Sequence, residues 1–189
     1  MEEAENPLQP QLCMVCGPSG SGKSRWAEHL AERSGAQVVY LATGPLLPED
    51  PAWQERLRKH RRRRPEHWGC LEVQGRLCEA LAELQPHQLA LVDSLGTWVA
   101  ELLCCSKEEW RDHCLQLRQT LIQRRLAVVL VSEEVSWGVV PATPIGGLFR
   151  ERLAGLNREL ASLCSAHWLV VQGRALDLLS LGQAVPPEI

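Results

Sequence analysis

A glycine-rich segment near the N-terminus is the part of the sequence best suited to chemistry. Residues Gly17–Ser24 read GPSGSGKS and fit the pattern GxxxxGK[ST], with an apolar run before them and an amphipathic segment after them. In that context the glycines let backbone N–H groups surround a β-phosphate, and the N-terminus of the following helix adds partial positive charge. Lys23 can reach the β- and γ-phosphates, and the Ser24 hydroxyl can ligate Mg²⁺. We therefore predict a nucleotide-phosphate cradle formed by Gly17, Pro18, Ser19, Gly20, Ser21, Gly22, Lys23 and Ser24.

An acidic residue at the end of another apolar run would complete this type of site. Asp93 directly follows Leu89–Val92, and a P-loop needs a metal-orienting carboxylate at the end of a neighbouring strand. We interpret Asp93 as the Mg²⁺ ligand that accompanies Ser24, with a plain helix N-cap as the alternative. Asp93 also begins a DxxG pattern ending at Gly96, as in switch GTPases, but the chain contains no [NT]KxD sequence for reading guanine. The switch interpretation is therefore not favoured.

Positive charge is concentrated around one histidine. Seven of the twenty Lys and Arg residues lie between Arg56 and Arg64, and the rest of the chain carries 13 against 23 Asp and Glu. A helix beginning after the turn signal PEDP would place Trp53, Leu57 and His60 on one face. Such a cluster can clamp phosphate oxygens, and a neutral imidazole can attack phosphorus to form a phosphoramidate. The alternatives are a solvated basic helix and an RNA-binding surface, and the acidic remainder with its single Tyr and single Phe counts against RNA.

The length and the pattern of the chain indicate an α/β domain. With 189 residues, 45% of them hydrophobic and 23% charged, wholesale disorder is excluded. Continuous apolar runs alternate with helical patterns, which predicts a doubly wound, mostly parallel sheet flanked by helices. The runs are Leu12–Cys16, Gln37–Ala42, Leu89–Val92, Ala127–Val131 and Trp168–Val171, and long helical patterns follow the cradle and span 108–125 and 147–164. We expect a short tail at 1–10 and a single nucleotide-binding domain at 11–189.

The cysteines and the N-terminus indicate a reducing compartment. Eight cysteines accompany an acidic N-terminus that lacks the basic and apolar regions of a secretory signal. No apolar run reaches the roughly 18 residues of a membrane span. Cys13 and Cys16 form a CxxC pair, but residues three apart on a strand point to opposite faces, which favours buried thiols over a metal site. We expect a cytoplasmic protein with neither a membrane span nor a nucleic-acid partner.

Five motifs, in order between about Gly17 and Gly173, resemble those of one enzyme family. They are GPSGSGKSRWAE, VVYLAT ending at Thr43, RLRKHRRRRPEHWGCLE, LVDSLGTWVAELL, and VSEEVSWGVVP followed by LFRERLAGLNRELA. The third contains HRxxRPxxWxxxE and is the most specific, because chance rarely produces that pattern beside a P-loop. On these residues the chain resembles the bifunctional adenosylcobinamide kinase / adenosylcobinamide-phosphate guanylyltransferase family of cobalamin biosynthesis.

The resemblance implies a fold, two reactions and a set of site residues. Members of that family have a P-loop fold with a RecA-like, mostly parallel sheet, and they commonly form trimers. With ATP or GTP they phosphorylate adenosylcobinamide, and they then transfer GMP from GTP, through a GMP–histidine intermediate, to adenosylcobinamide phosphate. On this chain the histidine is His60, which acts together with Lys23, and further nucleotide contacts fall on Thr43, Gly44, Pro45, Arg61, Arg62, Arg63, Arg64, Glu72 and Asp93. The alternative is a P-loop small-molecule kinase without guanylyltransferase activity.

The chain departs from the family pattern at a few positions. The family usually has Thr where this chain has Gly96, and it usually has NEVG where this chain has EEVS, so that Glu133 replaces an amide and Ser136 a glycine. Gly147 stands where the family has an arginine before the FR pair. We expect these positions to lie near the corrinoid or the second phosphate. Glu134 matches a characteristic family glutamate, whose role is either chemical or to hold its loop.

Overall fold

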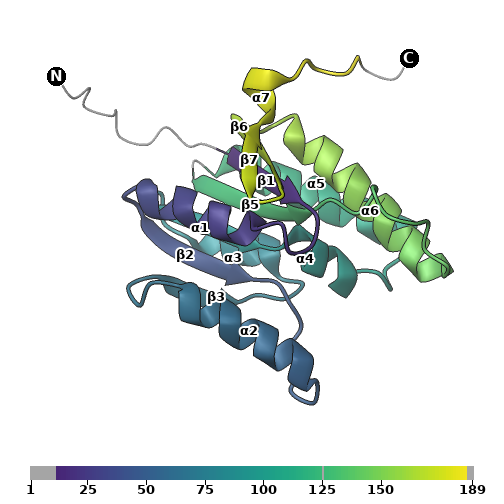
Figure 1. The fold of residues 1–189 in the computed structure, drawn as a ribbon, viewed down its shortest axis with the longest axis horizontal. Coiled ribbons are helices and arrows are strands. Elements are labelled where there is room, and N and C mark those ends of the chain that lie inside the picture. The colour runs from purple at the N-terminus through teal and green to yellow at the C-terminus, as the bar shows by residue number, and fades with distance from the viewer. Residues whose placement is uncertain (1–11, 125, 187–189) are drawn as a thin grey trace.

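A seven-stranded sheet forms the centre of the computed structural model, which describes residues 12–124 and 126–186 (Figure 1). The strand order is β3-β2-β4-β5-β1-β6-β7, and all neighbours pair in parallel except β6 and β7. The expected tail at 1–10 lies outside the described residues. The strands are β1 (Leu12–Gly17), β2 (Gln37–Ala42), β3 (Gly69–Glu72), β4 (Gln88–Asp93), β5 (Ala127–Glu133), β6 (Ala166–Val171) and β7 (Arg174–Asp177).

Helices cover both faces of this sheet, as the alternating pattern predicted. They are α1 (Lys23–Arg33), α2 (Pro51–Arg63), α3 (Leu77–Glu83), α4 (Leu95–Glu101), α5 (Lys107–Gln123), α6 (Pro144–Ala161) and α7 (Leu178–Leu181). Buried residues of α3, α4, α5 and α6 form one apolar core, and Ala27 and Ala31 of α1 belong to a second core. Figure 1 shows α2 beside β3, at the sheet edge remote from α6. The described part of the chain holds no helix with both the length and the apolarity that a bilayer crossing requires.

The central strands are buried on both faces, which explains their continuous apolar runs. Met14 and Cys16 of β1 point into the core under α3–α6, whereas Cys13 and Val15 point into the core under α1. The prediction that Cys13 and Cys16 lie on opposite faces is therefore confirmed. The five predicted strands are present, but β3 and β7 were missed because each has only four residues, lies at a sheet edge and alternates or exposes its side chains.

Burial divides the eight cysteines, all of them free, into reactive and unreactive thiols. Burial raises the pKa of the thiols of Cys13, Cys16, Cys78, Cys114 and Cys164 to about 12, so at about pH 8 they are thiolate in roughly one molecule in ten thousand. We expect brief iodoacetamide treatment followed by peptide mass mapping to label the exposed Cys70 and Cys104 first. Treatment in denaturant is the control that labels all eight, and early labelling of Cys13 would contradict this burial.

Candidate active site

The predicted site residues meet at the carboxyl edge of the sheet, where parallel strands place their following loops. Gly17 ends β1 and leads into the cradle, Glu72 ends β3 and Asp93 ends β4. Thr43, Gly44 and Pro45 follow β2. Residues up to 76 positions apart in the sequence are thus brought to one edge by the topology alone.

The loop after β1 has the conformation of a phosphate cradle. Gly20 and Gly22 have φ of 73° and 98°, in the left-handed region that glycine alone adopts readily. A side chain at Gly17 would overlap the carbonyl oxygen of Val170, so the first glycine is required by close packing. Lys23 and Ser24 then begin α1. A cavity of about 630 Å³, open to solvent, lies beside this loop and the first residues of the helix. That cavity is lined by Ser19, Gly20, Gly22, Lys23, Ser24, Arg25, His60 and Arg63.

Helix α2 carries His60 to this cavity. The Asp50 side chain caps the helix at the N–H of Trp53, and the Trp53 indole N–H donates to the carbonyl of Pro45 at 2.7 Å. Near the other end, the Arg63 guanidinium forms two hydrogen bonds to Glu28 of α1, at 3.0 and 3.2 Å. His60 therefore lines both the phosphate cavity and a smaller cavity at the ends of β2 and β4.

Asp93 is a buried carboxylate at the centre of the site, with Tyr40, His60 and Ser24 around it. Its Oδ2 accepts a hydrogen bond from the Tyr40 hydroxyl at 2.6 Å and lies 3.6 Å from Nδ1 of His60. The Ser24 hydroxyl lies near this carboxylate. Burial by itself would raise the pKa of the Asp93 carboxyl, but the interactions with His60, Tyr40 and Ser24 together hold that pKa below its ordinary value of 3.8. The N-cap of α4 is Ser94, so the capping alternative for Asp93 does not apply.

Tyr40 and Arg64 extend this cluster toward the smaller cavity. The Arg64 guanidinium stacks on the Tyr40 ring, 3.4 Å from its centroid, and Nη1 donates to Sγ of Cys70 at 3.1 Å. Nε of Arg64 is buried and has no protein hydrogen-bond partner among the described residues. The sequence placed Tyr40 in an apolar run and gave no sign that its hydroxyl faces a carboxylate.

Glu133, at the end of β5, is a second acid at the cradle. Its Oε1 lies 3.7 Å from Nζ of Lys23, and its Oε2 accepts a hydrogen bond from the backbone N–H of Gly96 at 3.0 Å. The Lys23 side chain is only 7% exposed, so this carboxylate is the nearest balance for a nearly buried charge. The sequence marked Glu133 and Gly96 only as departures from the family pattern, and the fold shows that the two residues touch.

Other residues predicted to contact the nucleotide lie outside the phosphate cavity or are bonded to other protein groups. The Thr43 side chain is buried, donating to the carbonyl of Ser94 at 2.6 Å and accepting from the Ser94 N–H at 2.8 Å. Arg61 pairs with Glu72 at 2.9 Å on the rim of the smaller cavity. Arg62 is exposed and lines neither the phosphate cavity nor the smaller cavity. All of the nucleotide contacts stay predictions, and for Thr43 and Arg62 the geometry offers no support.

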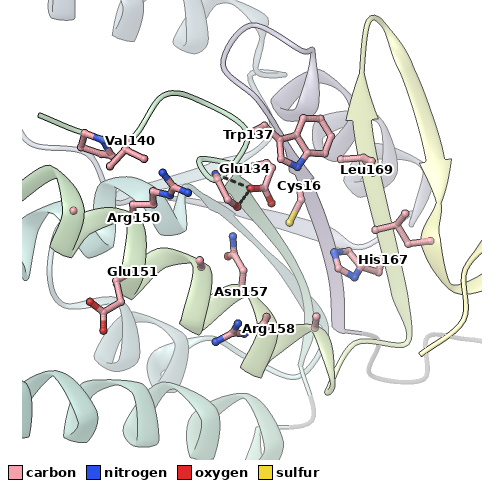
Figure 2. Close-up of a pocket in the computed structure, with 16 residues that line it drawn as sticks. Cys16, Glu134, Trp137, Val140, Arg150, Glu151, Asn157, Arg158, His167 and Leu169 are labelled. Atoms are coloured by element: carbon pink, nitrogen blue, oxygen red, sulfur yellow. Dashed lines mark hydrogen bonds between the residues drawn. The ribbon is translucent and has the colours of Figure 1, made fainter. Parts of the chain in front are cut away.

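A larger cavity of about 730 Å³ lies on the other side of β1, between α6 and β6 (Figure 2). Its wall includes Trp137, Val140 and Leu169, with Arg150 and Asn157 of α6 along one side. Glu134 holds the loop at its rim, because its carboxylate accepts hydrogen bonds from the backbone and hydroxyl of Ser136. Its own N–H donates to the carbonyl of Gly17 at 3.0 Å, which ties this cavity to the start of the cradle. Of the two roles left open for Glu134, this geometry favours holding the loop.

The single tyrosine of the chain provides a direct test of the Asp93 cluster. Burial first, and then the negative charge of Asp93, raise the pKa of Tyr40 well above its ordinary value of 10.0. Ionisation would put a second negative charge on the hydrogen bond, so we expect no tyrosinate absorbance from the folded protein just above pH 10.0. Unfolded protein is the control that titrates normally, and Asp93→Asn should lower the native pKa. A native titration near 10.0 would contradict the cluster.

Comparison with solved structures supports a P-loop NTPase fold. The chain superposes on a structure titled "Structural and biochemical analysis of a prototypical ATPase from the type III secretion system of pathogenic bacteria" with a TM-score of 0.59 and 12% identity. The match covers 93% of this chain and 59% of that ATPase, so the chain spans less than two thirds of its length. At this identity the likeness concerns the fold alone, and it agrees with the parallel sheet and the cradle described above.

Sequence relatives identify the family. The chain is 36% identical to the "Bifunctional adenosylcobalamin biosynthesis protein CobU" of Escherichia coli (strain K12), over 86% of this chain and 96% of that protein. It is 33% identical to the "Bifunctional adenosylcobalamin biosynthesis protein CobP" of Pseudomonas aeruginosa, over 87% of this chain and 95% of that protein. Residues 13–178 match the family described as "Cobinamide kinase / cobinamide phosphate guanyltransferase". With its cradle and histidine at one edge of the sheet, the chain belongs to the cobinamide kinase / cobinamide phosphate guanyltransferase family.

Proposed function

We propose that this chain phosphorylates adenosylcobinamide with ATP or GTP and then transfers GMP from GTP to adenosylcobinamide phosphate through His60. The observation that carries the proposal is the position of His60, which lines the cavity of Lys23 and Ser24 while its Nδ1 faces the Asp93 carboxylate. A P-loop kinase has no need for a histidine at this place. The family and its bifunctional relatives also favour two activities over a kinase alone.

In the guanylyl transfer, His60 acts as the nucleophile. Nδ1 of His60 faces Asp93 at 3.6 Å and Arg63 at 3.4 Å, which leaves Nε2 as the ring nitrogen that attacks. Nε2 attacks the α-phosphorus of GTP, a P–N bond forms, the bond to the bridging oxygen breaks, and pyrophosphate leaves. A phosphate oxygen of adenosylcobinamide phosphate then attacks the same phosphorus and the P–N bond breaks. The products are adenosylcobinamide-GDP and free His60, and Lys23 and Arg63 stabilise the phosphate charge.

In the kinase reaction, the cradle acts by positioning and by charge. The hydroxyl of adenosylcobinamide attacks the γ-phosphorus, the nucleoside diphosphate leaves, and the hydroxyl proton is lost as the phosphate ester forms. Lys23 is held at the base of the cavity with its side chain only 7% exposed, so its charge is little screened by water. Backbone N–H groups at the start of α1 bind the phosphate oxygens beside it.

Ser24 and Asp93 fit the Mg²⁺ that a P-loop enzyme uses. Their side chains lie near one another, one a hydroxyl and one a carboxylate, and oxygen ligands of this kind are those that Mg²⁺ prefers. When bound, the ion neutralises charge that develops on the phosphate oxygens. Few other protein ligands are expected, since Mg²⁺ usually keeps several waters and phosphate oxygens.

The cavity between α6 and β6 suits the acceptor. Adenosylcobinamide is large, with an apolar ring periphery and amide side chains, and the cavity of about 730 Å³ combines the apolar Trp137, Val140 and Leu169 with the polar Asn157 and Arg150. It opens beside Glu134, whose backbone contacts Gly17 at the start of the cradle. Of the departures from the family pattern, Ser136 and Gly147 line this cavity.

The cysteines and the family resemblance bear on where the protein is located and on its oligomeric state. The eight free cysteines support a reducing compartment, and we propose the cytoplasm. A trimer, which the family resemblance implies, stays a prediction.

Labelling with GTP that carries a labelled α-phosphate tests the histidine. We expect the protein to take up label in an acid-labile, alkali-stable form, because that stability pattern is typical of a P–N bond, and we expect His60→Ala to abolish it, because the bond forms at this ring. His87→Ala, which removes an exposed histidine hydrogen-bonded to Gln37, is the matched control. An unlabelled wild-type protein that still phosphorylates adenosylcobinamide would instead support a P-loop kinase alone.

Removal of the cradle lysine tests whether one cradle serves both reactions. Lys23→Ala should lower kcat/KM for phosphorylation and for GMP transfer by at least about a hundredfold, because both use triphosphates bound at the same N–H groups. The exposed Lys107→Ala provides a control for the loss of one positive charge. Full retention of either activity in steady-state assays would show that the two reactions use separate nucleotide sites.

A further inference from the structure

Glu133 places a negative charge beside the lysine that, in a P-loop enzyme, binds the negatively charged phosphates of the nucleotide. Its carboxylate lies 3.7 Å from the Lys23 ammonium, at the base of the cavity that is proposed to take the triphosphate. The distance is too long for a strong hydrogen bond, so the lysine is balanced in charge but is not locked in place. When a triphosphate enters, Lys23 turns to the β- and γ-phosphates.

Gly96 fixes where the Glu133 carboxylate lies. A Cβ on Gly96 would overlap Oε2 of Glu133 and would lie 2.8 Å from its Cδ, so the carboxylate fills the space of the missing side chain. The Gly96 N–H holds Oε2 at 3.0 Å. Gly96 itself is held by the start of α4, where Ser94 and Thr97 form a capping box and Leu95 and Trp98 are fully buried.

The carboxylate therefore stays in place when the lysine turns away. Its oxygen on Gly96 is anchored to α4, whose start is held by a capping box and by the buried Leu95 and Trp98. A γ-phosphate bound to Lys23 would then carry its charge near that of Glu133, whose side chain is 21% exposed, so that screening by water is reduced. Terminal phosphates are disfavoured relative to an enzyme with a neutral amide at this position.

We propose that Glu133 is a positioning residue for Lys23, seated by Gly96, and that its charge sets how strongly the cradle holds the terminal phosphates of the nucleotide. The inference rests on the proposed function only in that the cradle binds a nucleoside triphosphate. It assigns a shared role to two residues that differ from the family pattern and that lie 37 positions apart in the sequence.

Calorimetric titration of the full-length protein with GTP and with GMP, in buffer containing Mg²⁺, tests this role. Glu133→Gln keeps an acceptor for the Gly96 N–H but removes the charge, and we expect it to bind GTP about tenfold more tightly with GMP affinity unchanged. The nucleotide-free variant should also melt at a lower temperature, because Lys23 loses its counter-charge. Glu101→Gln, at the exposed end of α4, removes the same charge elsewhere and should leave both affinities as in wild type.

Gly96→Ala tests the same contact by sterics, without changing a charge. The added methyl group should push the carboxylate away from Gly96 and so raise GTP affinity, as Glu133→Gln does. In a protein that already carries Glu133→Ala, adding Gly96→Ala should change GTP affinity no further. A Glu133→Gln protein that melts lower but keeps the wild-type ratio of GTP to GMP affinity would overturn the inference alone. A wild-type protein that binds no GTP would overturn the proposed function, and this inference with it.

Discussion

A buried carboxylate at the end of β4 is the constraint around which the site is built. Removing the Asp93 charge from water is unfavourable unless hydrogen bonds replace the lost hydration. The Tyr40 hydroxyl on β2 supplies one such bond, and Ser24 at the start of α1 and His60 on α2 lie close to the same carboxylate. The need to satisfy one charge thus draws the phosphate cradle and the histidine to the same place.

The helix that carries the histidine is held unevenly. The single contact of Arg61 with Glu72 is exposed and contributes little to stability, whereas Arg63 binds both carboxylate oxygens of the largely buried Glu28. The Trp53 indole on the carbonyl of Pro45 and the approach of His60 to Asp93 add two further attachments. The position of His60, the proposed nucleophile, therefore depends on a few contacts of α2.

Two cavities divide the chemistry between the sides of β1. The cradle side is polar and holds the residues proposed to act on phosphates, whereas the side facing α6 has apolar walls that include Trp137. The link between them is short, from Gly17 to the backbone of Glu134. This arrangement suits the proposal that a large acceptor rests on one side while its reacting group reaches the nucleotide on the other.

Residue order alone was enough for the P-loop, five of the strands, the helix bearing His60 and the acid at Asp93, because each is a local pattern of glycines, apolar periodicity or strand-end chemistry. A local sequence pattern does not indicate which strand ends become neighbours in the sheet. The folded chain revealed that Tyr40, read as a core residue, bonds Asp93, and that Glu133 fills the space beside Gly96. It also showed that the buried Thr43 side chain bonds Ser94. These contacts join residues 37 to 53 positions apart, so they arise only when the sheet brings its carboxyl ends together.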